Sequence, residues 1–242
     1  MDIFDLVIEY HNAFPNSLCD EIVERFESDD RKAKGQNGNY GPNLTTSKVS
    51  TDLYLSSMSG WEDIDERLYN LLTPYISQYL EVLRDNIVLD EITNIRDQGY
   101  QIQRTTPGGY FHWHNDFYTS ILNDLRYING NGLPCCIVRQ RIFTYILYLN
   151  TRDTPDGVTE FKFGDSIKTV YAEKGKLLLF PPNPMCPHRG TVLDEGVKYL
   201  MTGWVTRDVI QDIQDQTFDE DREKRKRIYN SPEYDYLRLV DS

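Results

Sequence analysis

The chain has 242 residues, of which 39% are hydrophobic and 12% aromatic, and its formal net charge is −12. This length fits one domain of generous size better than two small ones, and it allows a core that needs no disulfide or structural metal. The acidic balance disfavours contact with nucleic acid or anionic lipid. No apolar run approaches the roughly 20 residues of a membrane span, and Met1–Asp5 lacks the cationic start of a signal peptide. We therefore expect a cytoplasmic protein that contacts neither nucleic acid nor a membrane.

The N-terminal part of the chain begins with a helical pattern followed by a polar stretch. A capped helix start is predicted at Ser17, and Leu18, Ile22 and Phe26 then recur at a spacing of four on one face. Residues 31–50 are rich in Gly, Asn and Ser, and this composition predicts a long polar loop.

A second helix is predicted from about residue 61 to about residue 84, where apolar residues recur with helical period. Pro74 lies inside this pattern and is expected to bend or interrupt the helix. Residues 1–97 are therefore expected to form a helical support with a polar loop, packed on the rest of the chain.

From Tyr100 onward the pattern changes from helical to alternating, which predicts a series of short strands. Helices followed by many short strands indicate an α+β fold, with a double-stranded β-helix (jelly-roll) barrel over residues 98–207 supported by the N-terminal helices. Residues 208–242 are strongly charged and predict a solvated tail or helix of the same single domain. The expected strands are 100–105, 110–116, 138–149, 158–163, 167–172, 176–181 and 197–206.

Three residues have the composition of a metal site. His114 and Asp116 lie at positions i and i+2 near the end of a predicted strand, so both side chains point to one face. His188 supplies a third donor. Two imidazoles and one carboxylate leave coordination positions open, which suits iron(II) that must bind a bidentate cosubstrate and dioxygen, whereas zinc favours a nearly closed tetrahedron. On these residues alone, a surface His beside an Asp is an equally good interpretation.

Two further strands carry side chains suited to a small dicarboxylate. Lys198, Thr202 and Trp204 share one face of the last strand with Leu200, and Lys198 would pair with the distal carboxylate. On the strand before Asn150, one face carries Ile142, Thr144, Ile146 and Tyr148, whose hydroxyl is placed to donate a second hydrogen bond. The alternative is that Tyr148 and Trp204 are ordinary core aromatics.

Residues 98–207 resemble the iron(II)/2-oxoglutarate dioxygenases of the prolyl 4-hydroxylase-like branch. The resemblance implies that His114, Asp116 and His188 are catalytic and hold iron(II), and that the Lys ten residues after the distal His binds 2-oxoglutarate. Ile146, Tyr148, Thr202 and Trp204 complete the expected cosubstrate site, and ascorbate is an expected reductant. The segments that carry the resemblance are Pro107–Phe111, His114–Asp116, Thr144–Asn150, Gly157–Phe161, Lys174–Pro181, His188–Gly190 and Lys198–Trp204.

The chain also departs from the family. Arg104 and Thr105 stand where such enzymes often carry a Tyr before the first iron ligand, so cosubstrate binding is expected to rely more on Tyr148, Lys198 and Thr202. Asp116 is present, which argues against the halogenating relatives that replace this carboxylate.

The remaining histidines and one cysteine are assigned other positions. His112 shares strand parity with His114, but the triad needs only one imidazole from this strand, so His112 is expected to flank the site. His11 is expected to be structural. Cys186, two residues before His188, is expected to be a small buried residue.

The expected reaction is hydroxylation of a C–H bond with conversion of 2-oxoglutarate and dioxygen to succinate and carbon dioxide. The Lys at position 198 resembles the prolyl-hydroxylating branch, and the long loops 31–50 and 118–135 are expected to close over an extended substrate. A prolyl residue in a polypeptide is therefore the predicted substrate. A free amino acid or another small molecule is the alternative, while the net charge disfavours a nucleic-acid demethylase. A binding scaffold without activity would be revealed by loss of an iron ligand, and none is lost.

Overall fold

The computed structural model describes residues 3–35, 47–56, 58–86, 95–122 and 135–212. These residues belong to two compact units. The first comprises residues 1–120 and 139–208 and contains the features discussed below; of the second, the structure describes only strand ends, at residues 121–122, 135–138 and 209–212. None of the described helices is long and apolar enough to cross a membrane.

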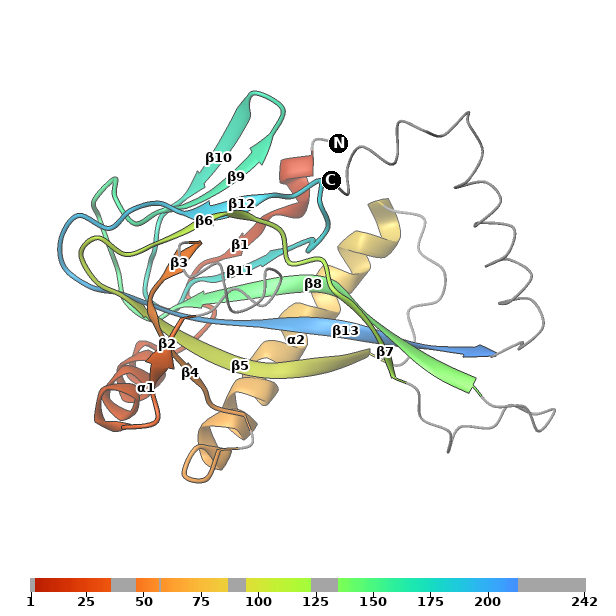
Figure 1. Cartoon of the computed structure of the whole chain (residues 1–242), viewed down its shortest axis with the longest axis horizontal. Coiled ribbons are helices and arrows are strands. Elements are labelled where there is room, and N and C mark those ends of the chain that lie inside the picture. The colour runs from red at the N-terminus through yellow and green to blue at the C-terminus, as the bar shows by residue number, and fades with distance from the viewer. Residues whose placement is uncertain (1–2, 36–46, 57, 87–94, 123–134, 213–242) are drawn as a thin grey trace, which may run out of the picture. The chain divides into compact units, whose positions relative to one another are not determined.

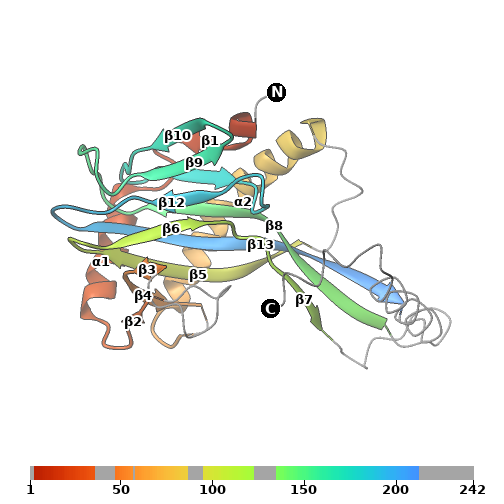
Figure 2. The ribbon, with the colours of Figure 1, turned by 45° about the horizontal axis from the view of Figure 1, so that its top comes forward.

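The described strands form two antiparallel sheets (Figures 1 and 2). The larger sheet has the order β1-β11-β8-β13-β5-β4-β2, with β7 pairing β8, and the smaller has the order β10-β9-β12-β6-β3. Neither sheet closes on itself within the described residues, so the predicted barrel is seen as two open sheets. The strands of the larger sheet are β1 (Ile8–Tyr10), β2 (Ala33–Lys34), β4 (Thr51–Tyr54), β5 (Ile95–Thr105), β7 (Thr119–Leu122), β8 (Cys135–Tyr148), β11 (Leu177–Phe180) and β13 (Lys198–Asp212). Those of the smaller sheet are β3 (Lys48–Val49), β6 (Tyr110–His114), β9 (Thr159–Phe163), β10 (Ser166–Val170) and β12 (His188–Gly190).

Both faces of the larger sheet carry buried apolar side chains, because successive side chains of a strand contribute to two different apolar clusters. On one face, Tyr145 and Leu147 of β8 and Met201 of β13 pack against the two helices, α1 (Asn16–Ser28) and α2 (Glu62–Asn86). On the other face, Ile146 and Tyr148 pack with Phe161 of β9, in the smaller sheet. Successive side chains of a strand point to opposite faces. The helices therefore cover one face of the larger sheet (Figure 1). The other face packs against the smaller sheet.

Each predicted strand has an observed counterpart, although β5 begins five residues earlier and β13 ends six residues later than predicted. Three features of the N-terminal part also differ. The first helix begins at Asn16, with Pro15 as its N-cap and no side-chain cap, so the predicted cap at Ser17 is wrong. The second helix is not interrupted at Pro74, because the apolar face on both sides of the proline remains packed and offsets the lost backbone hydrogen bond and the steric clash of the ring. The polar stretch 31–50 contains β2 and β3, while residues 36–46 lie outside the described part.

A 3₁₀ turn (Ile3–Leu6) precedes β1, which the sequence pattern did not predict because three residues are too few for a period. The segment after Asp116 forms β7 rather than a continuous loop, and residues 123–134 lie outside the described part, as do residues 213–242 of the predicted tail.

Close packing between β13 and β8 gives a test of this arrangement. A Cβ at Gly203 would lie 2.0 Å from the Tyr145 hydroxyl oxygen and 2.5 Å from the Gly99 carbonyl oxygen, and that hydroxyl donates to the same carbonyl at 3.2 Å. Gly203→Ala is expected to lower the free energy of unfolding by about 1–3 kcal/mol, because an overpacked core must shift. Urea denaturation measures this, with the exposed Thr169→Ala on β10 as control; equal stability of both variants would contradict the packing.

Candidate active site

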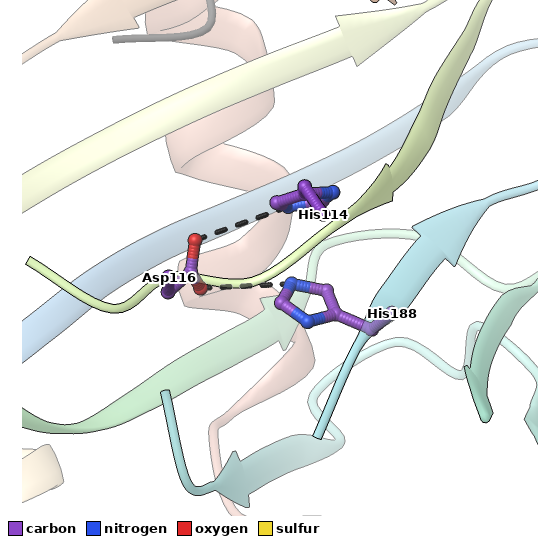
Figure 3. Close-up of side chains that lie close together, drawn as sticks. All are labelled: His114, Asp116 and His188. Atoms are coloured by element: carbon purple, nitrogen blue, oxygen red, sulfur yellow. Dashed lines mark ion pairs between the residues drawn. The ribbon is translucent and has the colours of Figure 1, made fainter. Parts of the chain in front are cut away.

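The pairing of β6 with β12 brings two histidines together. His114 is the last residue of β6, His188 is the first of β12, and the antiparallel register places them directly opposite each other. Their ring centroids lie 4.2 Å apart. Asp116 follows two residues beyond the end of β6 and turns its carboxylate toward both rings (Figure 3). One ligand atom from each residue lies within 4.8 Å of the others, and all three side chains are buried.

Hydrogen bonds orient these three side chains. His114 Nδ1 lies 2.7 Å from the carbonyl oxygen of His112 and so donates to it, which leaves the Nε2 lone pair facing the cluster. The Nε2 atoms of His114 and His188 lie 3.8 Å and 3.5 Å from the two oxygens of Asp116. Thr144 Oγ1 donates to Asp116 Oδ2 at 2.9 Å. The donor atoms are therefore held around a common point before any ion binds.

The protonation states suit metal binding. Burial lowers the pKa of both His114 and His188, so both imidazoles are neutral at physiological pH. Burial opposes ionisation of Asp116, but the neighbouring imidazoles and the hydrogen bond from Thr144 outweigh it and lower the pKa of this carboxyl. Two neutral imidazoles and one carboxylate are the protonation states that a divalent ion requires.

Aromatic rings enclose the two imidazoles. Phe111 stacks on His114 with centroids 3.6 Å apart and planes at 19°. Phe180 contacts the His188 ring edge to face at 4.7 Å, and Phe161 lies 5.6 Å away. These rings fix the imidazole planes and keep water from one side of the cluster, which strengthens electrostatic interactions there.

The triad faces a pocket of about 420 Å³ whose other wall carries Lys198. The Lys198 side chain is buried, and Nζ donates to the carbonyl oxygen of Gly157 at 2.6 Å and to Thr159 Oγ1 at 3.4 Å. Both acceptors are neutral, and no carboxylate of the described residues forms an ion pair with Lys198. Burial, with a smaller effect of Arg152, lowers the pKa of this ammonium group to about 7. A buried cation without a counter-ion favours an anionic ligand.

The other residues predicted to bind the cosubstrate are divided between the pocket and the core. Ile146, Thr202 and Trp204 line the pocket. Thr202 Oγ1 donates to the Tyr145 carbonyl oxygen at 2.9 Å. Tyr148 is fully buried, is not among the pocket-lining residues, and donates its hydroxyl to Thr159 Oγ1 at 2.8 Å. Its hydroxyl therefore reaches the Lys198 environment through Thr159.

The predicted flanking residues lie outside the cluster of donors. His112 is exposed, and its ring packs on Tyr110 with centroids 4.6 Å apart. His11 is also exposed, and its Nδ1 lies 2.8 Å from Glu173 Oε2. Cys186 is buried beside His188, as expected.

Residues that the sequence analysis did not single out also line the pocket. Arg141 lies with its guanidinium 3.6 Å from the Trp204 ring centroid, and it donates to Gln98 Oε1 at 2.9 Å and to the Asp116 carbonyl oxygen at 3.3 Å. Gln103 is buried and lines the pocket as well. Alternation along β5 could have placed Gln103 on the inner face, although alternation does not distinguish a pocket from a core. Alternation along β8 puts Arg141 on the face opposite Thr144 and Ile146, so it could not have found Arg141.

The comparisons with known proteins agree with this geometry. Residues 100–206 match the model of the 2OG-Fe(II) oxygenase superfamily. The resemblance predicted from the sequence is therefore confirmed. No curated protein sequence matches the chain significantly.

Solved structures share the fold at low sequence identity. A viral collagen prolyl hydroxylase from Paramecium Bursaria Chlorella virus-1, in complex with 2-oxoglutarate, has a TM-score of 0.53 at 16% identity over 84% of this chain and 96% of its own. A prolyl hydroxylase from Trichoplax adhaerens, in complex with a hypoxia inducible factor peptide fragment, has a TM-score of 0.56 at 15% identity over 88% and 86%. HygX from Streptomyces hygroscopicus, with nickel, 2-oxoglutarate and hygromycin B bound, has a TM-score of 0.53 at 15% identity over 85% of each chain.

Iron(II) and 2-oxoglutarate are the cofactors of this superfamily, and the residues fit both. The cluster offers two nitrogens and one oxygen as ligands. Among the described residues, it is the group of His, Cys, Asp and Glu side chains that could hold a metal ion. The side toward the pocket stays open, as a metal that binds a cosubstrate requires. Lys198 stands on the same pocket to receive the second carboxylate of a dicarboxylate.

The metal site is tested by removing single ligands. His114→Ala and His188→Ala are each expected to lower the affinity for iron(II) or manganese(II) more than about a hundredfold, beyond the usual effect of a supporting residue. Titration calorimetry measures the affinity, and circular dichroism checks the fold. His112→Ala is the matched control, since only the backbone of His112 contacts the cluster. Metal binding equal to that of the parent in both ligand variants would disprove the site.

The titration of Lys198 predicts how 2-oxoglutarate binding depends on pH. The pKa of about 7 means that the free protein loses the ammonium charge as pH rises through 7, so the affinity should fall about tenfold per pH unit above that point. His114 and His188 are already neutral there and do not contribute. Manganese(II)-loaded protein is titrated from pH 6 to 9.

Two variants separate the charge of Lys198 from its shape. Lys198→Arg keeps its charge over this range and should bind more weakly near pH 7 but without the pH dependence. Lys198→Ala should lose a few kcal/mol of 2-oxoglutarate binding. A parent affinity that does not change from pH 7 to 9, or an unaffected Lys198→Ala variant, would remove Lys198 from the cosubstrate site.

Proposed function

We propose that this 2-oxoglutarate-dependent oxygenase hydroxylates a C–H bond of a prolyl residue in a polypeptide, with iron(II) at His114, Asp116 and His188. The observation that carries the oxygenase chemistry is the pairing, in one pocket of about 420 Å³, of this triad with the buried Lys198. We also infer that the two sheets are the halves of a double-stranded β-helix, since the relatives described above share the fold.

When bound, iron(II) with 2-oxoglutarate and dioxygen supplies the oxidation, in which one oxygen atom enters the C–H bond and the other enters succinate as carbon dioxide is released. The chain supplies position and environment. Lys198 orients 2-oxoglutarate through its distal carboxylate, and Thr159 and Gly157 hold Lys198 in place. Thr144 fixes the rotamer of Asp116. Phe111 and Phe180 exclude water from the sides of the two imidazoles.

The mouth of the pocket supports an extended substrate. Tyr54 and Tyr118 both line the pocket and are each 42% exposed, so they lie where the pocket meets solvent. Arg141, held against Trp204, offers donors to a carbonyl oxygen beside Asp116. Tyrosine and arginine side chains are enriched in protein–protein interfaces, so their presence here suits a peptide chain that enters from outside. The acidic protein would favour neutral or basic segments.

A small-molecule substrate is the second candidate. The pocket volume lies within the range of roughly 300–1,000 Å³ that is common for small-molecule sites. Of the neighbours described above, one was solved with hygromycin B and another with a peptide fragment. The fold does not choose between the two substrate classes.

A substrate panel separates the two candidates. The protein with iron(II), 2-oxoglutarate and ascorbate is incubated with proline-containing peptides of neutral, basic and acidic sequence, and in parallel with free L-proline and other amino acids. We expect succinate and one added oxygen on the peptide, with basic and neutral sequences preferred. Mass spectrometry locates the oxygen. Oxygen found only on a free amino acid would disprove the peptide substrate but not the oxygenase reaction.

A further inference from the structure

A buried ion pair joins the two sheets at one wall of the pocket. Lys48 lies on β3 of the smaller sheet and Asp52 on β4 of the larger one, with Nζ 2.6 Å from Asp52 Oδ2. Both side chains are almost fully buried. Ser50 Oγ donates to the other oxygen of Asp52 at 2.7 Å. A Cβ at Gly35 would lie 2.1 Å from Ser50 Oγ and 3.1 Å from Asp52 Oδ2, so Gly35 packs directly against these two side chains. The carboxylate of Asp52 is thus a fixed acceptor.

This fixed acceptor sets the orientation of two amides in succession. Gln101 Nε2 donates to Asp52 Oδ2 at 3.1 Å, because an ionised carboxylate only accepts hydrogen bonds. The Gln101 carbonyl oxygen is thereby turned away from Asp52, and it accepts a hydrogen bond from Gln103 Nε2 at 3.0 Å. The relay ends at Gln103, where it determines which atom of the amide is the oxygen.

The end of the relay faces the metal pocket. Gln101 and Gln103 both line it, and β5 pairs with β13 so that Gln103 stands opposite Leu200, two residues from Lys198. In the described part of the chain, Gln103 Oε1 accepts no hydrogen bond, and it is not among the atoms closed off from solvent. An oriented acceptor with a free lone pair therefore lies on a pocket that must hold both cosubstrate and substrate.

We propose that Gln103 is a specificity residue whose Oε1 accepts a hydrogen bond from an N–H group of the substrate, and this rests on the proposed function. A carboxylate of 2-oxoglutarate offers no donor at physiological pH, so an amide oxygen fixed toward it would repel it. A prolyl residue has no N–H of its own. The first donor on its C-terminal side is the N–H of the following residue, and that is the group assigned to Gln103.

A matched pair of probes tests the hydrogen bond. The first is the blocked peptide acetyl-Ala-Pro-Ala-amide, and the second replaces the last alanine by lactate, so that an ester oxygen stands in place of the N–H. Binding to protein loaded with manganese(II) and 2-oxoglutarate is measured by calorimetry, without turnover. The parent should bind the amide about tenfold more tightly than the ester, as one hydrogen bond of typical net strength predicts.

Gln103→Met, which keeps the length and volume but not the acceptor, should bind the amide about tenfold less tightly and the ester unchanged, so that the preference disappears. Its affinity for 2-oxoglutarate should equal that of the parent. Arg104→Gln is the control on the same strand, since Arg104 points to the opposite side and pairs with Glu27, and it should keep the preference.

Three results would overturn the assignment. A preference for the amide that survives in Gln103→Met places the donor contact elsewhere. A parent that does not distinguish the amide from the ester has no such contact. A weaker affinity for 2-oxoglutarate in Gln103→Met makes this residue part of the cosubstrate site. Failure of the proposed function is separate, because neither succinate nor hydroxylated peptide would then form, whatever the binding preference.

Discussion

The site depends on the register between β6 and β12. With His188 opposite His114, two imidazoles from distant parts of the chain lie within 4.2 Å, ring to ring. A slip of one residue would turn one of them to the other face of the strand, because side chains alternate. The register is fixed from both sides, since β12 also pairs with β9, where His188 stands opposite Phe161. The pairing of strands in the smaller sheet therefore also determines how precisely the metal ligands are positioned.

The cationic side chains around the pocket differ in whether an acidic residue neutralises them. Lys48 is neutralised by Asp52, and Arg189 lies 2.7 Å from Glu160. Lys198, in contrast, meets only neutral oxygens, although burying an unpaired cation is costly and its pKa falls as a result. The fold tolerates this cost at a point facing the metal. A dianionic cosubstrate bound between the metal and Lys198 would recover it, which couples ligand binding to proton uptake and to stability.

Much of the fold and part of the site could be predicted from the sequence because they rest on alternation along single strands. Alternation placed His114 and Asp116 together and put Lys198 on the face that lines the pocket. It could not tell which residue lies across from a given one. Tyr148 has the right parity to reach a ligand, yet its hydroxyl is taken by Thr159, which comes from another strand. Partners of this kind follow from register and from the packing of one sheet on the other, and neither is written in the period of one strand.

The same limit applies more strongly to the end of the predicted polar loop 31–50, where β3 lies, and to β4 directly after it. Its composition is polar, and a polar stretch without a clear period favours a loop. In the structure its polar residues are satisfied by one another and by β5, so they can be buried, as Lys48 and Asp52 are. The amide nitrogens of Gln101 and Gln103 each donate to an acceptor within this network, and these bonds hold both amides in one orientation. The orientation of the Gln103 amide at the pocket therefore depends on the ion pair between Lys48 and Asp52, which joins the two sheets. The same contacts thus hold the sheets together and orient a side chain on the pocket wall.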